Sequence, residues 1–554
     1  MHPIREPLDR QHFDVAVIGG GINGVAIARE CARAGRRVFV VEQADFSSGT
    51  TSRATRIIHG GLRYLEHGEI GLVRESLRER ECLLKERPHL VRPLDFVLAM
   101  PPHSLGRRNA LAIRAALWLY RRASGSRTRT SGNDLATLEA ALDSGLELNL
   151  FPYEDAQCEF PERLVAEWMA EAMQSGAVLR NHTEALEILV QDGKARGLRV
   201  RDRLDAQEFE ISADWIVNAT GPWADEVLRD SNLEQEPLIG GVRGAHIVLP
   251  LFPGAPSQAL YAEVSDGRQI FVIPWAGQVL VGTTEVPQTS DPGTAEPSSA
   301  EVIYLLNSVR RLFPRAGVTV ADIRYTYAGV RPLPYSPGEP SSAIPRGHTL
   351  HDHLEDGVAG LITVIGGKLT TAASLARSCA RMMGVRVPEP RATMVAIGRA
   401  AGIENTLAQW SRAVSQIAGI PAQSASAIAE WHGRQALCIA RMAAGDPRLQ
   451  QTLCPHSDHI VAEAVEAIQH ESAVTLGDIL LRRVPVALGP CWDSECTRTA
   501  AERIGIAAGW SDHQCRAEIA SFTEERQRFL HPEGVAGMFS LLPIDASPLL
   551  ESTR

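Results

Sequence analysis

A glycine-rich turn near the N-terminus, Gly19-Gly20-Gly21-Ile22-Asn23-Gly24, constrains the fold of this chain more than any other feature. An apolar, β-branched run from Phe13 to Ile18 precedes the turn, and small residues with helical spacing follow it from Val25 to Ala34. A second apolar run, Arg37 to Val41, ends at Glu42. This order predicts a β-α-β unit, the start of a doubly wound α/β sheet.

Each glycine of the turn has a separate task in such a unit. We expect Gly19 to make the tight turn, Gly21 to let the backbone approach a pyrophosphate, and Gly24 to let the helix pack on the strand. The N-terminus of the helix would offer free N–H groups to the phosphates. Glu42 is placed to accept hydrogen bonds from a ribose. The turn therefore predicts a dinucleotide site rather than a purely structural turn.

Two later turns favour FAD over NAD as that dinucleotide. One apolar strand ends in Ala219-Thr220-Gly221, and another breaks at Gly366-Gly367-Lys368 into a helix from about Thr370. In a doubly wound sheet with inserted segments, both turns would meet the N-terminal unit around one long cofactor. Ala-Thr-Gly alone would be an ordinary turn, so the prediction of FAD depends on the three turns together.

The length of 554 residues is too great for one ordinary core. We predict an α/β plus α fold with three units: a discontinuous Rossmann-type FAD-binding domain (1–100 with 175–225 and 336–388), an antiparallel-sheet substrate or cap domain (101–174 with 226–335), and a C-terminal helical domain (389–554). The net charge of −10 argues against a general nucleic-acid binder, which would need a broad basic face.

The cysteine pattern favours buried or free thiols over the alternative of a structural zinc site. Nine cysteines are scattered along the chain, and the closest pair, Cys491 and Cys496, has no matching second pair. Buried or free thiols in a reducing compartment are the favoured interpretation. The polar start, 1–10, shows no signal or transit pattern, and no apolar run reaches the roughly 18 residues needed to span a bilayer. We therefore expect a cytoplasmic protein, soluble or bound to a membrane surface.

One helix, predicted over 107–122, has two interpretations. It is apolar in the middle, contains Trp118 and Tyr120, and carries arginines at both ends and at Arg114. Such a helix suits the interface plane of an anionic bilayer. It equally suits a core helix with solvated ends. The sequence leaves both interpretations open.

Three segments place cationic groups beside glycines: 57–64, 327–332 and 366–371. Lysine is rare in this chain and occurs only at Lys85, Lys194 and Lys368, so Lys368 is an unusual choice at its position. Arginine forks and a lysine point charge are what a small phosphate-bearing substrate needs. A set of unrelated surface cations is the alternative.

Six motifs follow one another along the chain: Arg53 with Thr55-Arg56-Ile57-Ile58-His59-Gly60-Gly61-Leu62-Arg63-Tyr64-Leu65-Glu66, then Asn218-Ala219-Thr220-Gly221-Pro222-Trp223, Gly244-Ala245-His246-Ile247-Val248, Val281-Gly282-Thr283-Thr284, Gly329-Val330-Arg331-Pro332-Leu333 and Gly366-Gly367-Lys368-Leu369-Thr370-Thr371. Together and in this order they resemble the FAD-dependent glycerol-3-phosphate dehydrogenases of the D-amino-acid-oxidase-type superfamily. The resemblance covers roughly residues 12–385. Two positions depart from the family pattern: Pro161-Glu162 stands where the family has Asp-Ala, and Glu285 stands where it has Asp.

The resemblance implies oxidation of sn-glycerol 3-phosphate to dihydroxyacetone phosphate in glycerol metabolism, by hydride transfer to FAD. Electrons would pass to a membrane quinone, with the protein peripheral on the inner face of the cytoplasmic membrane. A homodimer is a further expectation. Three rivals stay open: an oxidase that reduces O₂, a related FAD-dependent oxidoreductase of 2-hydroxy acids or amines, and a flavin-binding module without turnover.

The resemblance also assigns roles to individual residues. His246 would be the general base, with Arg331 and Lys368 beside it as catalytic residues. The substrate would be bound by Arg63, Tyr64, Arg331, Arg346 and Lys368. The cofactor would contact Gly19, Gly21, Gly24, Glu42, Thr51, Ser52, Thr55, Arg56, His59, Gly60, Gly61, Ala219, Thr220, Gly221, Gly367, Lys368, Leu369 and Thr370.

Overall fold

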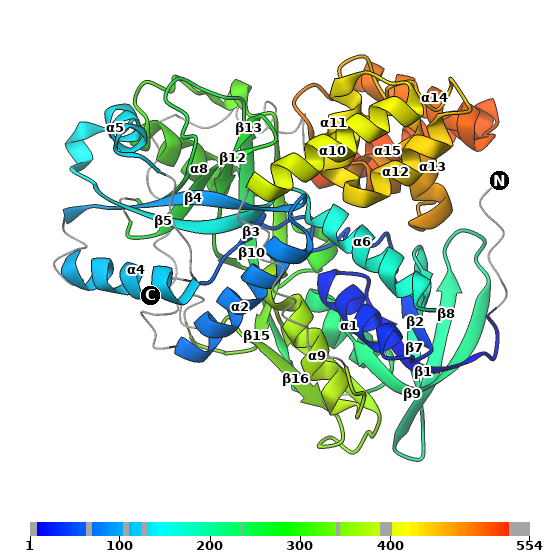
Figure 1. Cartoon of the computed structure of the whole chain (residues 1–554). Coiled ribbons are helices and arrows are strands. Elements are labelled where there is room, and N and C mark those ends of the chain that lie inside the picture. Colours follow the sequence, from blue (N-terminus) through cyan, green and yellow to red (C-terminus); the bar gives the residue numbers. More distant parts are fainter. Residues whose placement is uncertain are drawn as a thin grey trace.

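Two mixed β-sheets and a block of helices make up the molecule (Figure 1). The computed structural model describes residues 8–61, 69–102, 110–124, 130–233, 236–264, 266–339, 344–387 and 401–530. Within these ranges, no helix is both long and apolar enough to cross a membrane.

The first sheet contains the predicted β-α-β unit. Strand β1 (His12–Ile18) lies at its centre and pairs in parallel with β2 (Val38–Val41) and β9 (Glu208–Asn218), while helix α1 (Ile22–Arg33) connects β1 to β2. The strand order is β16-β17-β9-β1-β2-β6, with β7 and β8 attached to β9. The remaining strands are β6 (Val178–Arg180), β7 (Thr183–Gln191), β8 (Lys194–Asp202), β16 (His348–Asp352) and β17 (Leu361–Gly366).

Both faces of this sheet are covered. Helices α1, α6 (Pro161–Gln174) and α9 (Ala372–Met382) share one hydrophobic core with β1 and β2, and this core includes Val25, Trp168 and Leu375. On the other face, side chains of the β7–β8–β9 meander and Leu228 of α7 (Ala224–Asp230) pack on β1 and β2. Such covering of both faces is what a parallel sheet with near-continuous apolar strands requires.

The second sheet is built on four long strands, β10 (Ile239–Leu249), β15 (Tyr325–Pro334), β4 (Val91–Met100) and β5 (Asn149–Cys158). Its order is β14-β10-β13-β12-β11-β4-β5-β3, with β15 also paired to β10, and every pairing except β4 with β11 is antiparallel. The predicted, mostly antiparallel sheet is therefore present. The shorter strands are β3 (Ile57–Ile58), β11 (Ala259–Glu263), β12 (Gln269–Trp275), β13 (Gln278–Gly282) and β14 (Val286–Pro287).

Four helices flank this second sheet. Helices α5 (Gly132–Ala141) and α8 (Ser299–Leu312) contribute Leu138 and Leu305 to a core on one face. Helices α2 (Ile70–Glu86) and α4 (Ala110–Ser124) contribute Leu77 and Leu117 to the core on the other face. Short 3-10 turns occur at 144–146, 221–223, 292–294, 320–322 and 369–371.

Some segments pack with a different sheet from the one predicted for their part of the sequence. Strands β3 and β4 lie within 1–100 but pair in the second sheet, and α6 lies within 101–174 but packs with α1. An apolar strand carries no mark of which sheet it will join, because its partners lie far along the chain. The proposed domain limits stay a prediction, and the limit near Pro388 falls outside the described residues.

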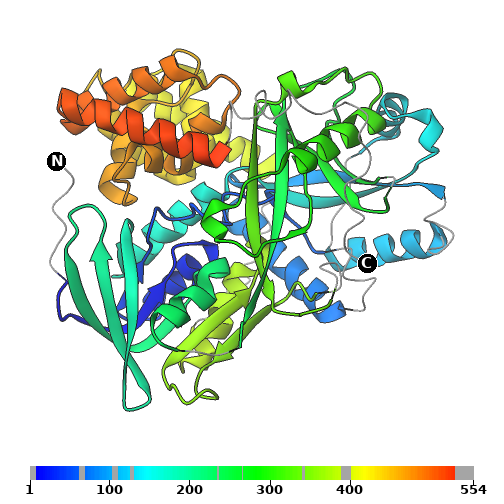
Figure 2. The ribbon, with the colours of Figure 1, turned by 180° about the vertical axis from the view of Figure 1, so that it is seen from behind.

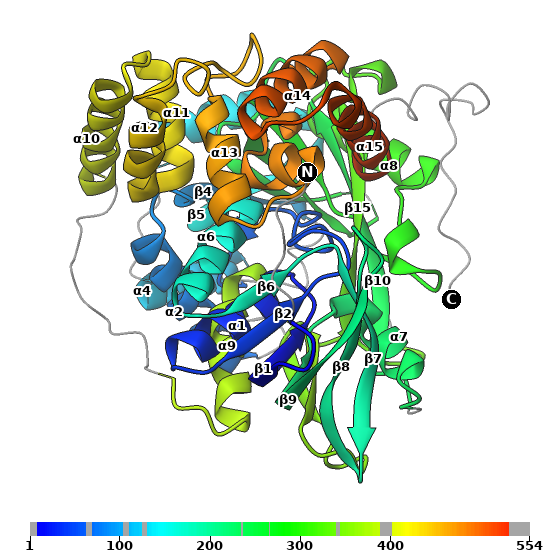
Figure 3. The same cartoon turned by 90° about the vertical axis from the view of Figure 1, so that its right-hand side faces the viewer.

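The C-terminal part is helical, as predicted, and covers one end of the molecule (Figures 1 and 2). Its core is continuous with that of the second sheet, since Leu480, Ala500 and Phe522 belong to the same cluster as Trp275 and Tyr325. Figure 3 shows these helices, in yellow to red, above the layer of β1, β2 and α1. They are α10 (Ala401–Ala418), α11 (Ala422–His432), α12 (Ala436–Ala443), α13 (Val461–His470), α14 (Ser494–Ala508) and α15 (Asp512–Leu530), with short helical turns at 433–435, 478–483 and 486–488.

Candidate active site

A cavity of about 1230 Å³ lies where the two sheets and the C-terminal domain meet. The glycine turn after β1 lines it, as do β10, β15 and the turn after β17. Helix α15 contributes Glu525, Arg528 and Phe529 to its wall. The carboxyl ends of β1, β2 and β9 therefore open into the same space as the second sheet, the usual ligand position in doubly wound folds.

The glycine turn has the conformation that a pyrophosphate cradle needs. Gly19 has φ +104°, and a Cβ on it would lie 2.6 Å from the Ala219 carbonyl oxygen, so no side chain is tolerated there. A Cβ on Gly24 would lie 2.0 Å from the Gly19 carbonyl oxygen, because α1 packs closely on the turn. The backbone N–H of Ile22 donates to Thr51 Oγ1 (3.0 Å) at the start of α1.

Glu42 places a carboxylate beside the glycine turn. Its carboxylate accepts hydrogen bonds from the backbone N–H groups of Gly20 (2.7 Å) and Ala44 (2.9 Å). Burial raises the pKa of Glu42 above its ordinary value. The carboxyl group lines the cavity at the end of β2, where a ribose hydroxyl would reach it. These residues fit the adenosine and pyrophosphate parts of FAD.

Most of the predicted cofactor residues line the cavity. Three do not: Gly24 packs against Gly19, Ser52 Oγ donates to the Ser47 carbonyl (2.6 Å), and Gly60 N–H donates to Tyr120 Oη (2.9 Å). Those that line it are Gly19, Gly21, Glu42, Thr51, Thr55, Arg56, His59, Gly61, Ala219, Thr220, Gly221, Gly367, Lys368, Leu369 and Thr370.

Arg56 is held in place by one of the departures from the family pattern. Its guanidinium donates to both carboxylate oxygens of Glu162 (3.0 and 3.0 Å) and lies 4.5 Å from the Trp275 ring centroid. Both charged groups are buried, and the nearby carboxylate raises the pKa of Arg56 against the opposing effect of burial. Glu162 thus gives a buried cation its partner, with Pro161 in the first turn of α6.

His246, on β10, lines the same cavity as the glycine turn. It is 2% exposed, its Nε2 is 3.0 Å from Thr55 Oγ1, and its ring stacks on Tyr327 with centroids 4.8 Å apart. Gly282 makes room for this ring, because a Cβ there would be 2.3 Å from His246 Cδ2. Burial, and then the Arg331 cation, lowers the pKa of His246 to about 3. The imidazole is therefore neutral at neutral pH and able to accept a proton.

Three cationic side chains line the same cavity as His246. Arg331 Nη2 donates to Thr283 Oγ1 (2.9 Å), and Arg346 Nη2 donates to Glu285 Oε1 (2.7 Å). Burial lowers the pKa of Lys368 to about 7. All three cations line the same cavity, so the structure brings together the residues predicted to bind an anion. Glu285, the second departure from the family pattern, is the ion-pair partner of Arg346.

One further hydrogen bond joins two segments that line the cavity. The backbone N–H of His59 donates to Thr370 Oγ1 (3.2 Å), which links β3 to the turn after β17. Burial, followed by the Lys368 and Arg80 charges, lowers the pKa of His59 to about 3. Arg63 and Tyr64 fall outside the described residues, so their predicted contact with substrate stays a prediction.

The C-terminal domain supplies a part of the cavity wall that no sequence motif predicted. Arg53 lies 5.1 Å from the ring centroid of Phe529 in α15, and both residues line the cavity with Arg482. Burial lowers the pKa of Arg53 to about 10. Arg53 is the first residue of a family motif, but the resemblance assigned it no role. No local pattern marks Phe529, because its position depends on the packing of a distant domain.

Comparisons with known proteins match this geometry. Residues 14–380 match the family model described as FAD dependent oxidoreductase, and residues 393–515 match that of the C-terminal domain of alpha-glycerophosphate oxidase. A glycerol-3-phosphate dehydrogenase of Synechocystis sp. is 35% identical over 94% of this chain and 97% of its own length. The chain belongs to the FAD-dependent glycerol-3-phosphate dehydrogenase family. An aerobic glycerol-3-phosphate dehydrogenase of Staphylococcus haemolyticus is 30% identical over 87% of this chain and 88% of its own.

Solved structures agree on the fold of this family member. The glycerol-3-phosphate dehydrogenase from Bacillus halodurans complexed with FAD has a TM-score of 0.72 at 23% identity and covers 95% of this chain and 97% of its own. The reduced L-alpha-glycerophosphate oxidase from Mycoplasma pneumoniae, with FAD bound, has a TM-score of 0.51 at 15% identity, covering 69% and 97%. The predicted family, fold class and FAD cofactor are confirmed.

Proposed function

We propose that this chain oxidises sn-glycerol 3-phosphate to dihydroxyacetone phosphate. The observation that carries the proposal is the meeting of a neutral, buried imidazole with three cations in one cavity that also contains the FAD cradle. A phosphate needs the cations, and an alcohol that loses hydride needs a base for its proton. A flavin-binding module without turnover would need neither His246 nor Lys368.

When bound, FAD would accept the hydride that leaves carbon C2 of the substrate. Arg331, Arg346 and Lys368 hold the phosphate and so position C2 in the cavity. His246 takes the proton of the C2 hydroxyl as the C–H bond breaks, which leaves a carbonyl. We place that proton on Nε2, which faces the Thr55 hydroxyl, because Nδ1 is shut off from solvent and has no hydrogen-bond partner among the described residues.

The test is anaerobic bleaching of the bound flavin by glycerol 3-phosphate. His246→Ala should bind FAD normally but reduce it about 10²- to 10⁴-fold more slowly, the usual contribution of a general base. His351→Ala, on β16, is the matched control and should reduce FAD at the wild-type rate. Unchanged bleaching in His246→Ala would exclude the proposed base. Equal rates with glycerol would exclude the phosphate site.

We also propose a membrane quinone as electron acceptor, with the protein bound to the inner face of the cytoplasmic membrane. Support comes from α4, which exposes Leu111, Trp118 and Leu119. Membrane contact would bring the protein to a quinone pool. The O₂-reducing alternative is separated by one measurement: reduction of a quinone analogue without oxygen, against release of peroxide in air. A homodimer stays a prediction.

A further inference from the structure

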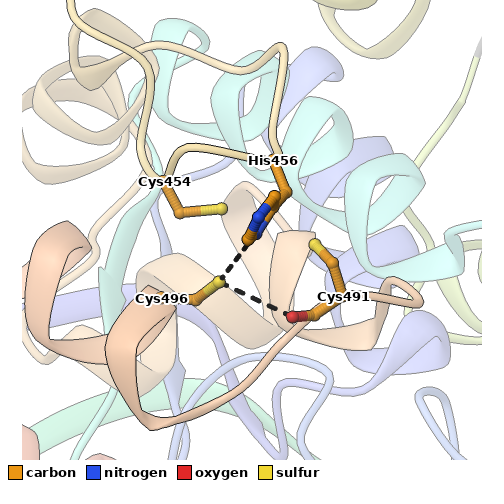
Figure 4. Close-up of side chains that lie close together, drawn as sticks. All are labelled: Cys454, His456, Cys491 and Cys496. Atoms are coloured by element: carbon orange, nitrogen blue, oxygen red, sulfur yellow. Dashed lines mark hydrogen bonds between the residues drawn. The ribbon is translucent and has the colours of Figure 1, made fainter.

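Three cysteines and one histidine meet in the C-terminal domain (Figure 4). Cys454 and His456 come from the loop between α12 and α13, whereas Cys491 precedes α14 and Cys496 lies in its first turn. The three Sγ atoms and one imidazole nitrogen all lie within 4.8 Å of one another. Cys496 Sγ is 3.8 Å from His456 Nδ1. None of these groups belongs to the flavin site.

We propose that these four side chains bind one structural zinc ion. Zinc holds thiolate sulfur at about 2.3 Å and imidazole nitrogen at about 2.0 Å in a tetrahedron, which spaces the ligand atoms about 3.5 to 3.8 Å apart. The Cys496 Sγ to His456 Nδ1 separation of 3.8 Å fits this spacing, and the 4.8 Å limit on the other separations allows one ion to reach all four ligands. A two-iron cluster would hold the ligands of its opposite irons farther apart. Three thiolates and one imidazole are also a typical structural zinc set.

The backbone prepares both halves of this site. In the first half, Thr452 bridges to Ile460, and the Leu453 N–H donates to the His459 carbonyl (2.7 Å), so Cys454 and His456 sit on a short closed loop. In the second half, the Asp493 side chain caps α14 by accepting from the Cys496 N–H (2.8 Å). Little ordering of the chain is therefore needed when the ion binds.

Burial fits a structural rather than a catalytic ion. Cys454 and Cys496 are buried, Cys491 is half-buried and His456 is exposed. The two buried cysteines belong to a hydrophobic core that also includes Leu453 and Ala500. The exposed imidazole leaves a path by which the ion reaches the site, and four protein ligands leave no open position for substrate.

Two other groups of metal-ligating side chains occur in the described part of the chain, and both are satisfied without an ion. Asp45 and Asp478 are neutralised by buried guanidinium groups, with Arg483 at 2.7 Å from Asp45. Asp356 lies on an exposed turn and pairs with His351 (2.6 Å) and His353 (2.9 Å), so one carboxylate already serves two rings.

A zinc ion at this site would stabilise the contact between the C-terminal helical domain and the second sheet. The segment just before Cys491 reaches that sheet: the Leu488 carbonyl accepts from Tyr325 Oη (2.7 Å) and from Gln278 Nε2 (3.0 Å). Tyr325 begins β15, the strand that also carries Arg331. The zinc ion would cross-link this segment to the loop between α12 and α13.

The test measures metal in the full-length protein purified without chelator. We expect about one zinc per chain in the wild type, loss of zinc in Cys454→Ser and Cys496→Ser, and retention in His456→Cys, which keeps four ligands. Cys438→Ser removes an exposed thiol outside the cluster and should keep the zinc. Wild-type protein without zinc, with iron in its place, or with a disulfide among these cysteines would overturn the proposal.

A second variant guards against loss of zinc through misfolding. His456→Ala changes an exposed side chain, so it should keep FAD and helical content but lose most of its zinc. A chelator should then lower the melting temperature of the wild type and leave that of His456→Ala unchanged, because metal binding stabilises only a chain that holds the metal. Replacement by Co²⁺ should give the d–d bands of a tetrahedral thiolate site. An octahedral spectrum, or full zinc in His456→Ala, would refute the ligand set.

Discussion

Lys368 has a titration that falls in the physiological pH range. Burial in the cavity disfavours its ammonium form and lowers its pKa to about 7. Lys368 is therefore a cation below that pH and becomes neutral as the pH rises through it. Phosphate binding needs the cation, so we expect kcat/KM for glycerol 3-phosphate to fall on the alkaline side of pH 7.

The substrate itself complicates this profile, because a phosphate monoester loses its second proton at a pH of about 6. Lys368→Arg separates the two effects, since arginine stays charged throughout. The ratio of wild-type to Lys368→Arg kcat/KM should decrease between pH 6 and pH 8.5, although the absolute value for the variant is lower. Parallel profiles would show that Lys368 does not titrate in the free enzyme.

The environment of His246 shows why single residues are hard to assign from sequence. The sequence gives this histidine no visible partner. In the structure its ring lies between Thr55, Tyr327 and Gly282, which come from three distant parts of the chain. The resemblance to a family pointed to His246, whereas spacing along β10 alone did not. Cys454 and His456 were missed for the same reason: a Cys-x-His pair far upstream of Cys491 has no local signal.

Helix α4 matches its core-helix interpretation on one face, while the membrane-surface interpretation of its other face stays a prediction. Leu117 and Tyr120 are buried against the second sheet, whereas Trp118 is 60% exposed. Tyr120 Oη donates to Asp155 Oδ1 (2.7 Å), which anchors the buried face. The amphipathic pattern predicted the helix but left open which neighbour would cover each of its faces. Packing answers this for one face only.

The exposed face of α4 should bind anionic vesicles. Replacing Leu111, Trp118 and Leu119 with serine removes apolar groups that would each contribute about 1.5 to 3 kcal/mol when buried, so we expect affinity to fall at least roughly tenfold. Flavin reduction by glycerol 3-phosphate should not change. Leu354→Ser, which alters an equally exposed leucine between β16 and β17, is the control. Equal vesicle binding by the wild type and the triple variant would refute the surface-helix proposal.

At the scale of the whole molecule, a buried carboxylate joins the nucleotide-binding sheet to the C-terminal domain. Asp45 follows β2, and its oxygens accept from Arg483 Nη1 (2.7 Å) and Nη2 (2.8 Å) as well as from Arg482 Nε. All three side chains are almost fully buried. No local pattern predicted this contact, because it joins residues more than four hundred positions apart.

Asp45→Asn should cost roughly 3 to 5 kcal/mol of the free energy of unfolding, because it removes the carboxylate that two buried guanidinium groups share. Asp446→Asn is the matched control: Asp446 pairs with Arg448 (2.6 Å), but the Arg448 side chain is exposed, so this substitution should change the free energy of unfolding far less. Urea unfolding followed by tryptophan fluorescence measures both. Similar midpoints for the two variants would show that the buried contact does not hold the domains together.

The same substitution should also release FAD, and this links the contact to function. Asp45 lies in the segment that contains Glu42, Thr51 and Thr55, all of which line the cavity, and Arg482 lines it from the other side. A loosened contact therefore moves both walls of the cofactor site. We expect flavin to leave Asp45→Asn at a lower urea concentration than the one at which the helices unfold. Simultaneous loss of flavin and helical structure, as in a single cooperative transition, would instead mean that the contact stabilises the fold as a whole without controlling access to the cavity.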